Sequence, residues 1–131
     1  MIQADADLEA FLTRLERPFE RLPDGTYVIG SGVGRPLVGL KLSPPVLVFR
    51  AAIGNVPVDP SAKLGLLQKL LELNHSALLH AAYGLDQDRI VLSAALELES
   101  ADLGELEAVL ADMDLALAEH VPVLQKLRQP Q

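Results

Sequence analysis

The segment between residues 78 and 99 constrains the fold more than any other part of the chain. Two sets of side chains alternate along its second half, one apolar throughout and one that grades from apolar to charged: Ile90, Leu92, Ala94, Leu96 and Leu98, against Val91, Ser93, Ala95, Glu97 and Glu99. A period of two is typical of a β-strand that buries one face. The short acidic connection at residues 86–88 joins this strand to the apolar residues 78–85, which predicts an antiparallel hairpin.

Three further strands are predicted upstream of this hairpin. Residues 26–29, 35–42 and 45–53 are rich in β-branched and other apolar side chains, and glycine and proline turns separate them. A parallel crossover needs a dozen or more residues, which these connections do not offer. The three strands should therefore form an antiparallel meander.

Three helices are predicted around these strands. The first has an apolar stripe at steps of three and four, which comprises Leu8, Phe11, Leu12, Leu15, Phe19 and Leu22. Pro18 should kink or end this helix near Arg17. The second should begin at Asp59 as its N-cap, with Pro60 in the first turn, and it is apolar on more than one side. The third should begin near Asp102, and Pro122 should kink or break it near His120.

These elements predict a single α+β domain over residues 1–131, because the chain has one continuous pattern without a repeat or a linker. The expected order is α-β-β-β-α-β-β-α. The strands should form a twisted antiparallel sheet of about five strands, with the first and last helices packed on one face. Half of the 131 residues are hydrophobic, which is enough for a proper core.

The charge balance limits the classes of partner. Acidic residues outnumber Lys and Arg by 18 to 11, which gives a formal net charge of −7. A nucleic-acid backbone is held by clustered basic side chains, so no nucleic-acid partner is expected. No apolar stretch has the length of a membrane span, and the first residues lack the pattern of a secretory leader. A cytoplasmic protein without a membrane partner is expected.

The sequence offers no convincing catalytic, cofactor or metal site. The "GSGVG" segment at residues 30–34 lacks the following helix that a dinucleotide fingerprint requires, so it is interpreted as a turn. His75 and His80 are five residues apart, which matches neither a helix face nor a strand face, and no metal-ligand pattern surrounds them. There is no cysteine, and no serine lies in a nucleophile motif. We therefore expect a protein that is not an enzyme and that carries no cofactor.

Three local patterns together resemble a known group of proteins. They are Leu73-Asn74 at a helix end, Gly84-Leu85-Asp86 at a strand end, and the strand at residues 89–99. The combination resembles the Tir-chaperone (CesT) and YbjN-like superfamily, which contains the class I type III secretion chaperones. The resemblance implies a small, acidic, cytoplasmic protein that dimerises and holds an extended, unfolded segment of a secreted protein. The alternative within the same superfamily is a YbjN-like regulatory or sensory domain that acts through protein–protein contacts.

The expected binding surface is the sheet face that the helices leave free. Its candidate peptide-binding residues come from the first strand and from the two arms of the hairpin: Val28, Leu78, His80, Ala82, Val91, Ser93 and Ala95. A homodimer is also expected, because the second helix has more leucines than one side can bury, with Leu66, Leu67 and Leu70 as its interface candidates. The same free sheet face is an equally weighted alternative for the dimer interface.

Overall fold

The structure, a computed structural model, describes residues 1–128 and contains a six-stranded sheet with three helices. The elements are α1 (Asp5–Arg14), β1 (Phe19–Arg21), β2 (Tyr27–Ile29), β3 (Val38–Ser43), β4 (Val46–Asn55), α2 (Pro60–Ser76), β5 (Ala82–Asp86), β6 (Arg89–Glu97) and α3 (Leu103–Arg128). The strand order is β1-β2-β3-β4-β6-β5, and every neighbouring pair is antiparallel. The predicted α+β class and antiparallel sheet are confirmed, with one more strand than the predicted order contains.

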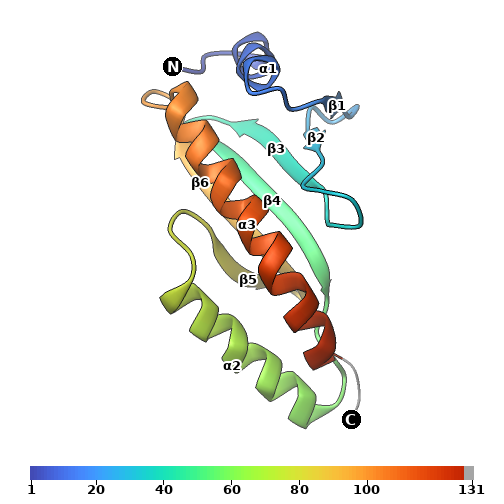
Figure 1. Cartoon of the computed structure of the whole chain (residues 1–131). Coiled ribbons are helices and arrows are strands. Elements are labelled where there is room, and N and C mark those ends of the chain that lie inside the picture. The colour runs from blue at the N-terminus through green and yellow to red at the C-terminus, as the bar shows by residue number, and fades with distance from the viewer. Residues whose placement is uncertain (129–131) are drawn as a thin grey trace.

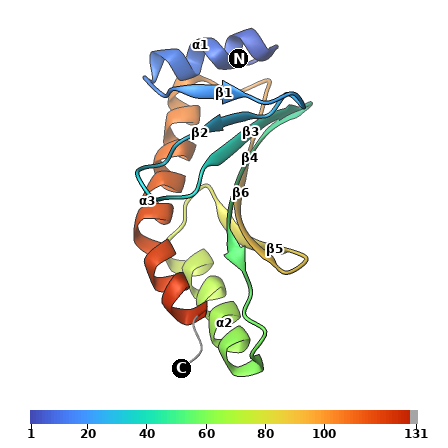
Figure 2. The same cartoon turned by 90° about the vertical axis from the view of Figure 1, so that its right-hand side faces the viewer.

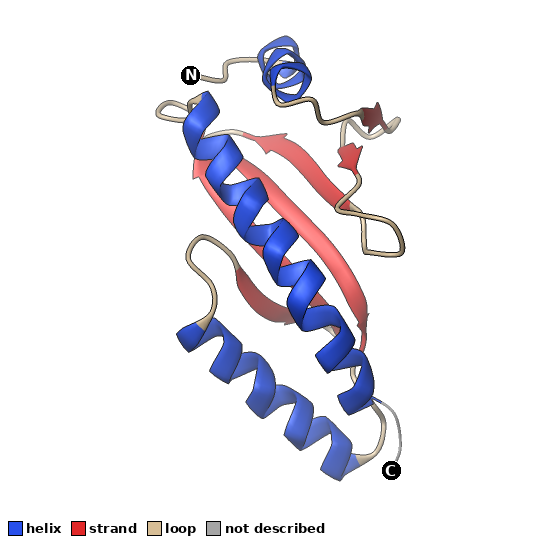
Figure 3. Cartoon of the chain, viewed as in Figure 1, coloured by secondary structure: helices blue, strands red, loops and turns tan. Residues whose placement is uncertain are grey.

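The helices lie on one side of the sheet or at its end (Figures 1 and 2). The long helix α3 runs along β4 and β6, and α2 lies beside α3 and β5 (Figure 3). The shorter helix α1 covers the end of the sheet next to β1 (Figure 2). Within residues 1–128, no helix covers the opposite side of the sheet (Figure 2). One sheet face is therefore buried and the other is open.

The buried face forms a continuous apolar core. Its largest fully buried side chains include Phe49 of β4, Leu92 of β6 and Leu106 of α3. Burying a leucine or phenylalanine side chain contributes roughly 1.5–3 kcal/mol to folding. The alternation predicted for residues 90–98 is confirmed on this side, because Ile90 and Leu92 are fully buried and the other three residues pack against the core.

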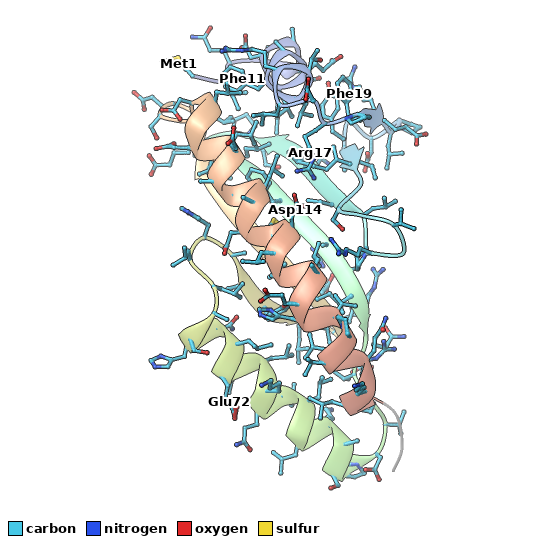
Figure 4. The ribbon with its side chains drawn as sticks, viewed as in Figure 1. Met1, Phe11, Arg17, Phe19, Glu72 and Asp114 are labelled. Carbon is cyan, nitrogen blue, oxygen red and sulfur yellow. The ribbon has the colours of Figure 1, made fainter. Side chains whose placement is uncertain are left out.

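The first helix is shorter than the apolar stripe predicted. Helix α1 ends at Arg14, and Glu16 follows with φ 56°, in the left-handed region. The chain then reverses, and Phe19 enters strand β1, where its ring packs edge-on against Tyr27 with a 5.5 Å centroid distance. Arg17 points from this turn to α3, where its guanidinium donates to both carboxylate oxygens of Asp114 at 2.8 and 3.2 Å (Figure 4).

The start of β5 was also predicted too early. Strand β5 begins at Ala82, not at residue 78, and α2 continues to Ser76. The carboxylate of Asp112 on α3 accepts the backbone N–H groups of Leu79, His80 and Ala81, the last two at 2.8 and 3.1 Å. These bonds hold the chain in a turn where a strand ladder was expected.

Pro122 does not break α3, which runs without interruption from Leu103 to Arg128 (Figure 1). Proline in a helix removes the N–H that would bond to the carbonyl four residues earlier, here that of Ala118. Pro122 lies on the exposed side of α3, where water can satisfy this carbonyl. The core residues on either side of it, Val121 and Leu124, hold the helix on the sheet.

Candidate protein-binding face

The uncovered side of the sheet is the candidate site, and we call it the open face. Its residues follow from the strand register and from the alternation of burial along each strand. The outward-pointing residues are Glu20, Val28, Gly39, Lys41, Ser43, Val46, Val48, Arg50, Ala52, Ala82, Gly84, Asp86, Arg89, Val91, Ser93, Ala95 and Glu97. Most of them are small or apolar, so the face is a shallow floor with charges at a few positions.

One row of this floor crosses the sheet from β2 to β5. In the register, Val28 lies opposite Gly39, Gly39 opposite Arg50, Arg50 opposite Ser93, and Ser93 opposite Ala82. Side chains directly opposite each other on antiparallel strands are close neighbours. The arginine is the one charged residue of this row, and the residues beside it are small.

Next to this row lies a depression of about 400 Å³, lined by Val48, Arg50, Leu85, Asp86, Val91 and Ser93. Arg50 of β4 forms an ion pair with Asp86 of β5. Because Arg50 lies opposite Ser93 and Asp86 lies opposite Arg89, this ion pair spans β6 at the level of Val91. Val91 is only 8% exposed although it points to the open face. The pair and its neighbours therefore cover an apolar residue.

The predicted peptide-binding residues divide into two groups. Val28, Ala82, Val91, Ser93 and Ala95 all lie on the open face, and their role in binding stays a prediction. The other two, Leu78 and His80, precede β5 and do not belong to the sheet. Leu78 packs partly buried against the core, and His80 is exposed in the turn that Asp112 holds.

Strand β4 supplies central residues of the open face that the predicted set does not contain. Val48, Arg50 and Ala52 point outward, while Leu47, Phe49 and Ala51 are buried. The alternation in "VLVFRAA" is the sequence signal for this, since it has the same period of two as β6.

The leucines predicted for the dimer interface are largely used inside the chain. Leu66 is fully buried and Leu70 is 5% exposed, and both belong to the core, so this prediction is corrected. Leu67 is partly buried against the same core. The exposed leucines of α2 are instead Leu64 and Leu71, at 68% and 70% exposure. They are seven residues apart and therefore lie on one helix face.

A group of polar residues ties α2, β5 and α3 together. The side chain of Asn74 accepts from the Tyr83 backbone N–H at 2.7 Å and donates to the Tyr83 carbonyl at 3.1 Å. The Tyr83 hydroxyl and His120 Nδ1 are hydrogen-bonded at 2.8 Å. Burial raises the pKa of Tyr83 and lowers that of His120. These residues satisfy one another in the interior, which identifies them as architecture.

The described part of the chain shows no cluster of side chains that could hold a metal ion. Within residues 1–128, no group of three His, Asp or Glu side chains lies close enough to hold a metal ion. No buried side-chain nitrogen or oxygen in that range lacks a hydrogen-bond partner. None of its helices is long and apolar enough to span a bilayer. The most extensive feature left for function is the open face itself.

Comparison with protein families gives one decisive result: the model of the CesT_Tir_1 family matches residues 1–129. The chain belongs to the CesT_Tir_1 family. This confirms the resemblance to the CesT and YbjN-like superfamily. The expectation that the chain is not an enzyme agrees with its membership of this family. No curated protein sequence matches the chain.

Solved structures with the same fold agree with this assignment. YbjN from E. coli superposes with a TM-score of 0.71 at 18% identity, over 91% of this chain and 92% of that one. The ExoU–SpcU complex of the Pseudomonas aeruginosa type III secretion system gives 0.70 at 22% identity, with 91% and 98% coverage. The Yersinia pestis secretion chaperone SycH, in complex with a fragment of YscM2, gives 0.57 at 22% identity, with 86% and 97% coverage. At these identities the likeness establishes the fold.

Proposed function

We propose that this protein is a cytoplasmic, non-enzymatic chaperone that holds an extended segment of a secreted protein on its open face. The observation that carries the proposal is a sheet whose helices all lie on one side or at its end, in a chain of the CesT_Tir_1 family. Its structural neighbours include chaperones bound to secretion proteins. A sheet face of small and apolar residues is a surface to which a partner can bind without catalysis.

The geometry of the open face suits an extended segment. Successive side chains of an extended peptide point to opposite sides, so every second side chain meets the floor. The row from Val28 to Ala82 offers small residues on both sides of Arg50, and Val48 and Ala95 form the next pair along β4 and β6. Alternate apolar side chains of the partner can rest on these positions.

We also propose that the chaperone is a homodimer joined through α2. Leu64 and Leu71 form an exposed apolar stripe on this helix. In a dimer with twofold symmetry the stripe of one copy can pack against that of the other. A contact of this kind leaves the open face of each copy available. The alternative that the open face itself joins the two copies remains and is separated by experiment below.

A regulatory role of the YbjN kind is the second candidate. The structure of YbjN, described as a candidate transcription regulator, superposes as well as the ExoU–SpcU complex does. Such a domain acts on a folded protein, whereas the first proposal needs an unfolded segment. Hydrogen exchange on the captured partner distinguishes them, because a chaperone-bound segment exchanges rapidly outside its contacts.

The test compares Ala95→Asp with Ala108→Asp. Both alanines are exposed, but Ala95 lies on the open face and Ala108 lies on the outer side of α3. Each tagged variant is used to capture partners from the native cell, and its size is measured by light scattering. We expect Ala95→Asp to lose a secreted partner that the wild type and Ala108→Asp retain, with all three chains of the same size.

Two other outcomes contradict this assignment of the face. If Ala95→Asp halves the mass of the particle, then the open face is the dimer interface. If Ala95→Asp captures the same partner as the wild type at the same yield, then the partner binds elsewhere.

A further inference from the structure

Arg50 is the central charged side chain of the open face. It lies on β4, between Gly39 of β3 and Ser93 of β6 in the register. A glycine and a serine leave room beside the guanidinium for a group from outside the chain. Its side chain is 48% exposed, although it lies on one of the two central strands of the sheet.

The guanidinium has unused hydrogen-bonding capacity. An arginine side chain has five N–H donors in a fork that matches a carboxylate. Among residues 1–128, Arg50 makes one side-chain hydrogen bond, from Nη2 to Asp86 Oδ2. A second carboxylate can therefore bind to Arg50 with or without displacing Asp86.

The surrounding charges favour an incoming anion over an incoming cation. Lys41 lies opposite Val48, two pairs further along β3 and β4 on the same face, and is therefore a diagonal neighbour of Arg50. Asp86 lies next to the hairpin turn and opposite Arg89 in the register, and its ion pair is with Arg50. The centre of the open face thus has two cations, Arg50 and Lys41, against the one carboxylate of Asp86, although the whole chain has a net charge of −7.

We propose that Arg50, together with Lys41, binds an acidic side chain of the partner's extended segment. This inference rests on the proposed function and specifies the chemistry of its ligand. The acidic residue of the segment pairs with the guanidinium, and the apolar residues two positions before and after it rest on Val48 and Val91. Asp86 competes with this acidic residue and keeps the apolar depression covered while no segment is bound.

The experiment uses two short synthetic peptides of alternating valine and threonine, with glutamate or glutamine at one central apolar position. Their binding to the full chain is measured by fluorescence anisotropy at low salt. We expect the wild type to bind the glutamate peptide about threefold to fivefold more tightly, as for an exposed ion pair. This preference should shrink as the ionic strength rises.

Two substitutions in the same ion pair should act in opposite directions. Arg50→Gln should abolish the preference for glutamate, whereas Asp86→Asn should increase it by removing the competing carboxylate. An ion pair that only stabilises the fold would weaken binding of both peptides in both variants. The matched control is the exposed pair between Arg21 and Asp5, at 2.7 Å, which lies away from the depression. Arg21→Gln and Asp5→Asn should leave both affinities unchanged.

The outcomes separate this inference from the proposed function. If the wild type binds both peptides equally, or if Arg50→Gln keeps the preference for glutamate, the inference is wrong and the binding face stands. If Asp86→Asn leaves the preference unchanged, Asp86 does not compete and that part of the inference is overturned. If neither peptide binds, both the inference and the assignment of the open face are wrong. Circular dichroism of each variant shows whether it is folded. If Arg50→Gln does not fold, Arg50→Lys replaces it in the experiment, because lysine keeps the positive charge but lacks the forked N–H donors of the guanidinium.

Discussion

Tyr83 of β5 and His120 of α3 meet in the interior, where the tyrosine hydroxyl and His120 Nδ1 lie 2.8 Å apart. Tyr83 is 6% exposed and His120 is 7% exposed. The same tyrosine is bound through its backbone to the side chain of Asn74 on α2. One residue of the edge strand thus connects the strand to both helices that cover it.

Replacing Tyr83 by Phe should therefore destabilise the fold. The substitution keeps the ring but leaves His120 Nδ1 without its partner in a buried position, which costs about 1–3 kcal/mol. Urea unfolding followed by circular dichroism measures the free energy of unfolding. His80→Ala is the control, because His80 is exposed and its side chain should contribute less than about 0.5 kcal/mol. An unchanged urea midpoint for Tyr83→Phe would show that the hydrogen bond does not stabilise the fold.

The hydrogen bonds that Asp112 accepts explain why local sequence does not predict where β5 begins. The alternation of residues 90–98 is local, and it predicted the buried face of β6 correctly. The turn before β5 depends on Asp112, which lies 31 residues beyond Ala81 in the sequence. No local pattern contains such a contact. Strand β1 has only three residues and continues an apolar stripe with helical spacing, so periodicity assigned it to the helix.

The candidate site was predictable to a similar extent. The period of two correctly placed Ala82, Val91, Ser93 and Ala95 on the open face, because each lies within a strand. It failed for Leu78 and His80, because both lie before the strand begins. For α2, the sequence showed too many leucines for one helix face but not which ones the core uses. That choice depends on how α2 packs against α3 and β5.

Burial of His120 should make stability depend on pH. Desolvation by burial is the main effect and lowers the pKa of His120. In the unfolded chain this pKa is near 6.5, so as the pH falls below that value the unfolded state binds a proton that the folded state does not. The free energy of unfolding should therefore fall from about pH 7 towards the lowered pKa of the folded state.

The pH effect is tested by urea unfolding of the wild type, His120→Gln and His80→Gln at pH 7.5 and 5.5. His120→Gln should lose less stability between the two values than the wild type, whatever its stability at pH 7.5. His80→Gln is the control for replacing a histidine at an exposed position. Equal losses for all three chains would mean that His120 does not cause the dependence.

A dimer joined through α2 should dissociate when an exposed leucine of this helix is replaced by a charged residue. Leu71→Asp places a charge in the proposed interface, where it would be desolvated without a partner. We expect a monomer with an unchanged circular dichroism spectrum, because Leu71 is 70% exposed within the chain. Light scattering at micromolar concentration measures the mass. Leu115→Asp is the matched control, since Leu115 is an exposed leucine on the outer side of α3.

The buried leucines of the same helix should behave differently. Leu66→Ala removes a fully buried side chain from the core, and such substitutions cost about 2–5 kcal/mol. We expect a lower urea midpoint. Any loss of dimer should only reflect the loss of folded chains, because Leu66 is not expected in the interface. A Leu66→Ala chain that is fully stable but monomeric would restore Leu66 to the interface.

Substitutions at Val91 and Ala95 should separate effects on the stability of the fold from effects on binding at the open face. Both point outward from β6, but Val91 is 8% exposed beneath the ion pair of Arg50 and Asp86, whereas Ala95 is exposed. Val91→Asp buries an unpaired carboxylate beside Asp86, and a loss of at least about 2 kcal/mol is expected. Ala95→Asp should change the free energy of unfolding by less than about 1 kcal/mol. Thermal and urea unfolding of both variants check this difference. If Val91→Asp is as stable as Ala95→Asp, the ion pair does not cover Val91 in solution, and the apolar depression is already open to a partner before any segment arrives.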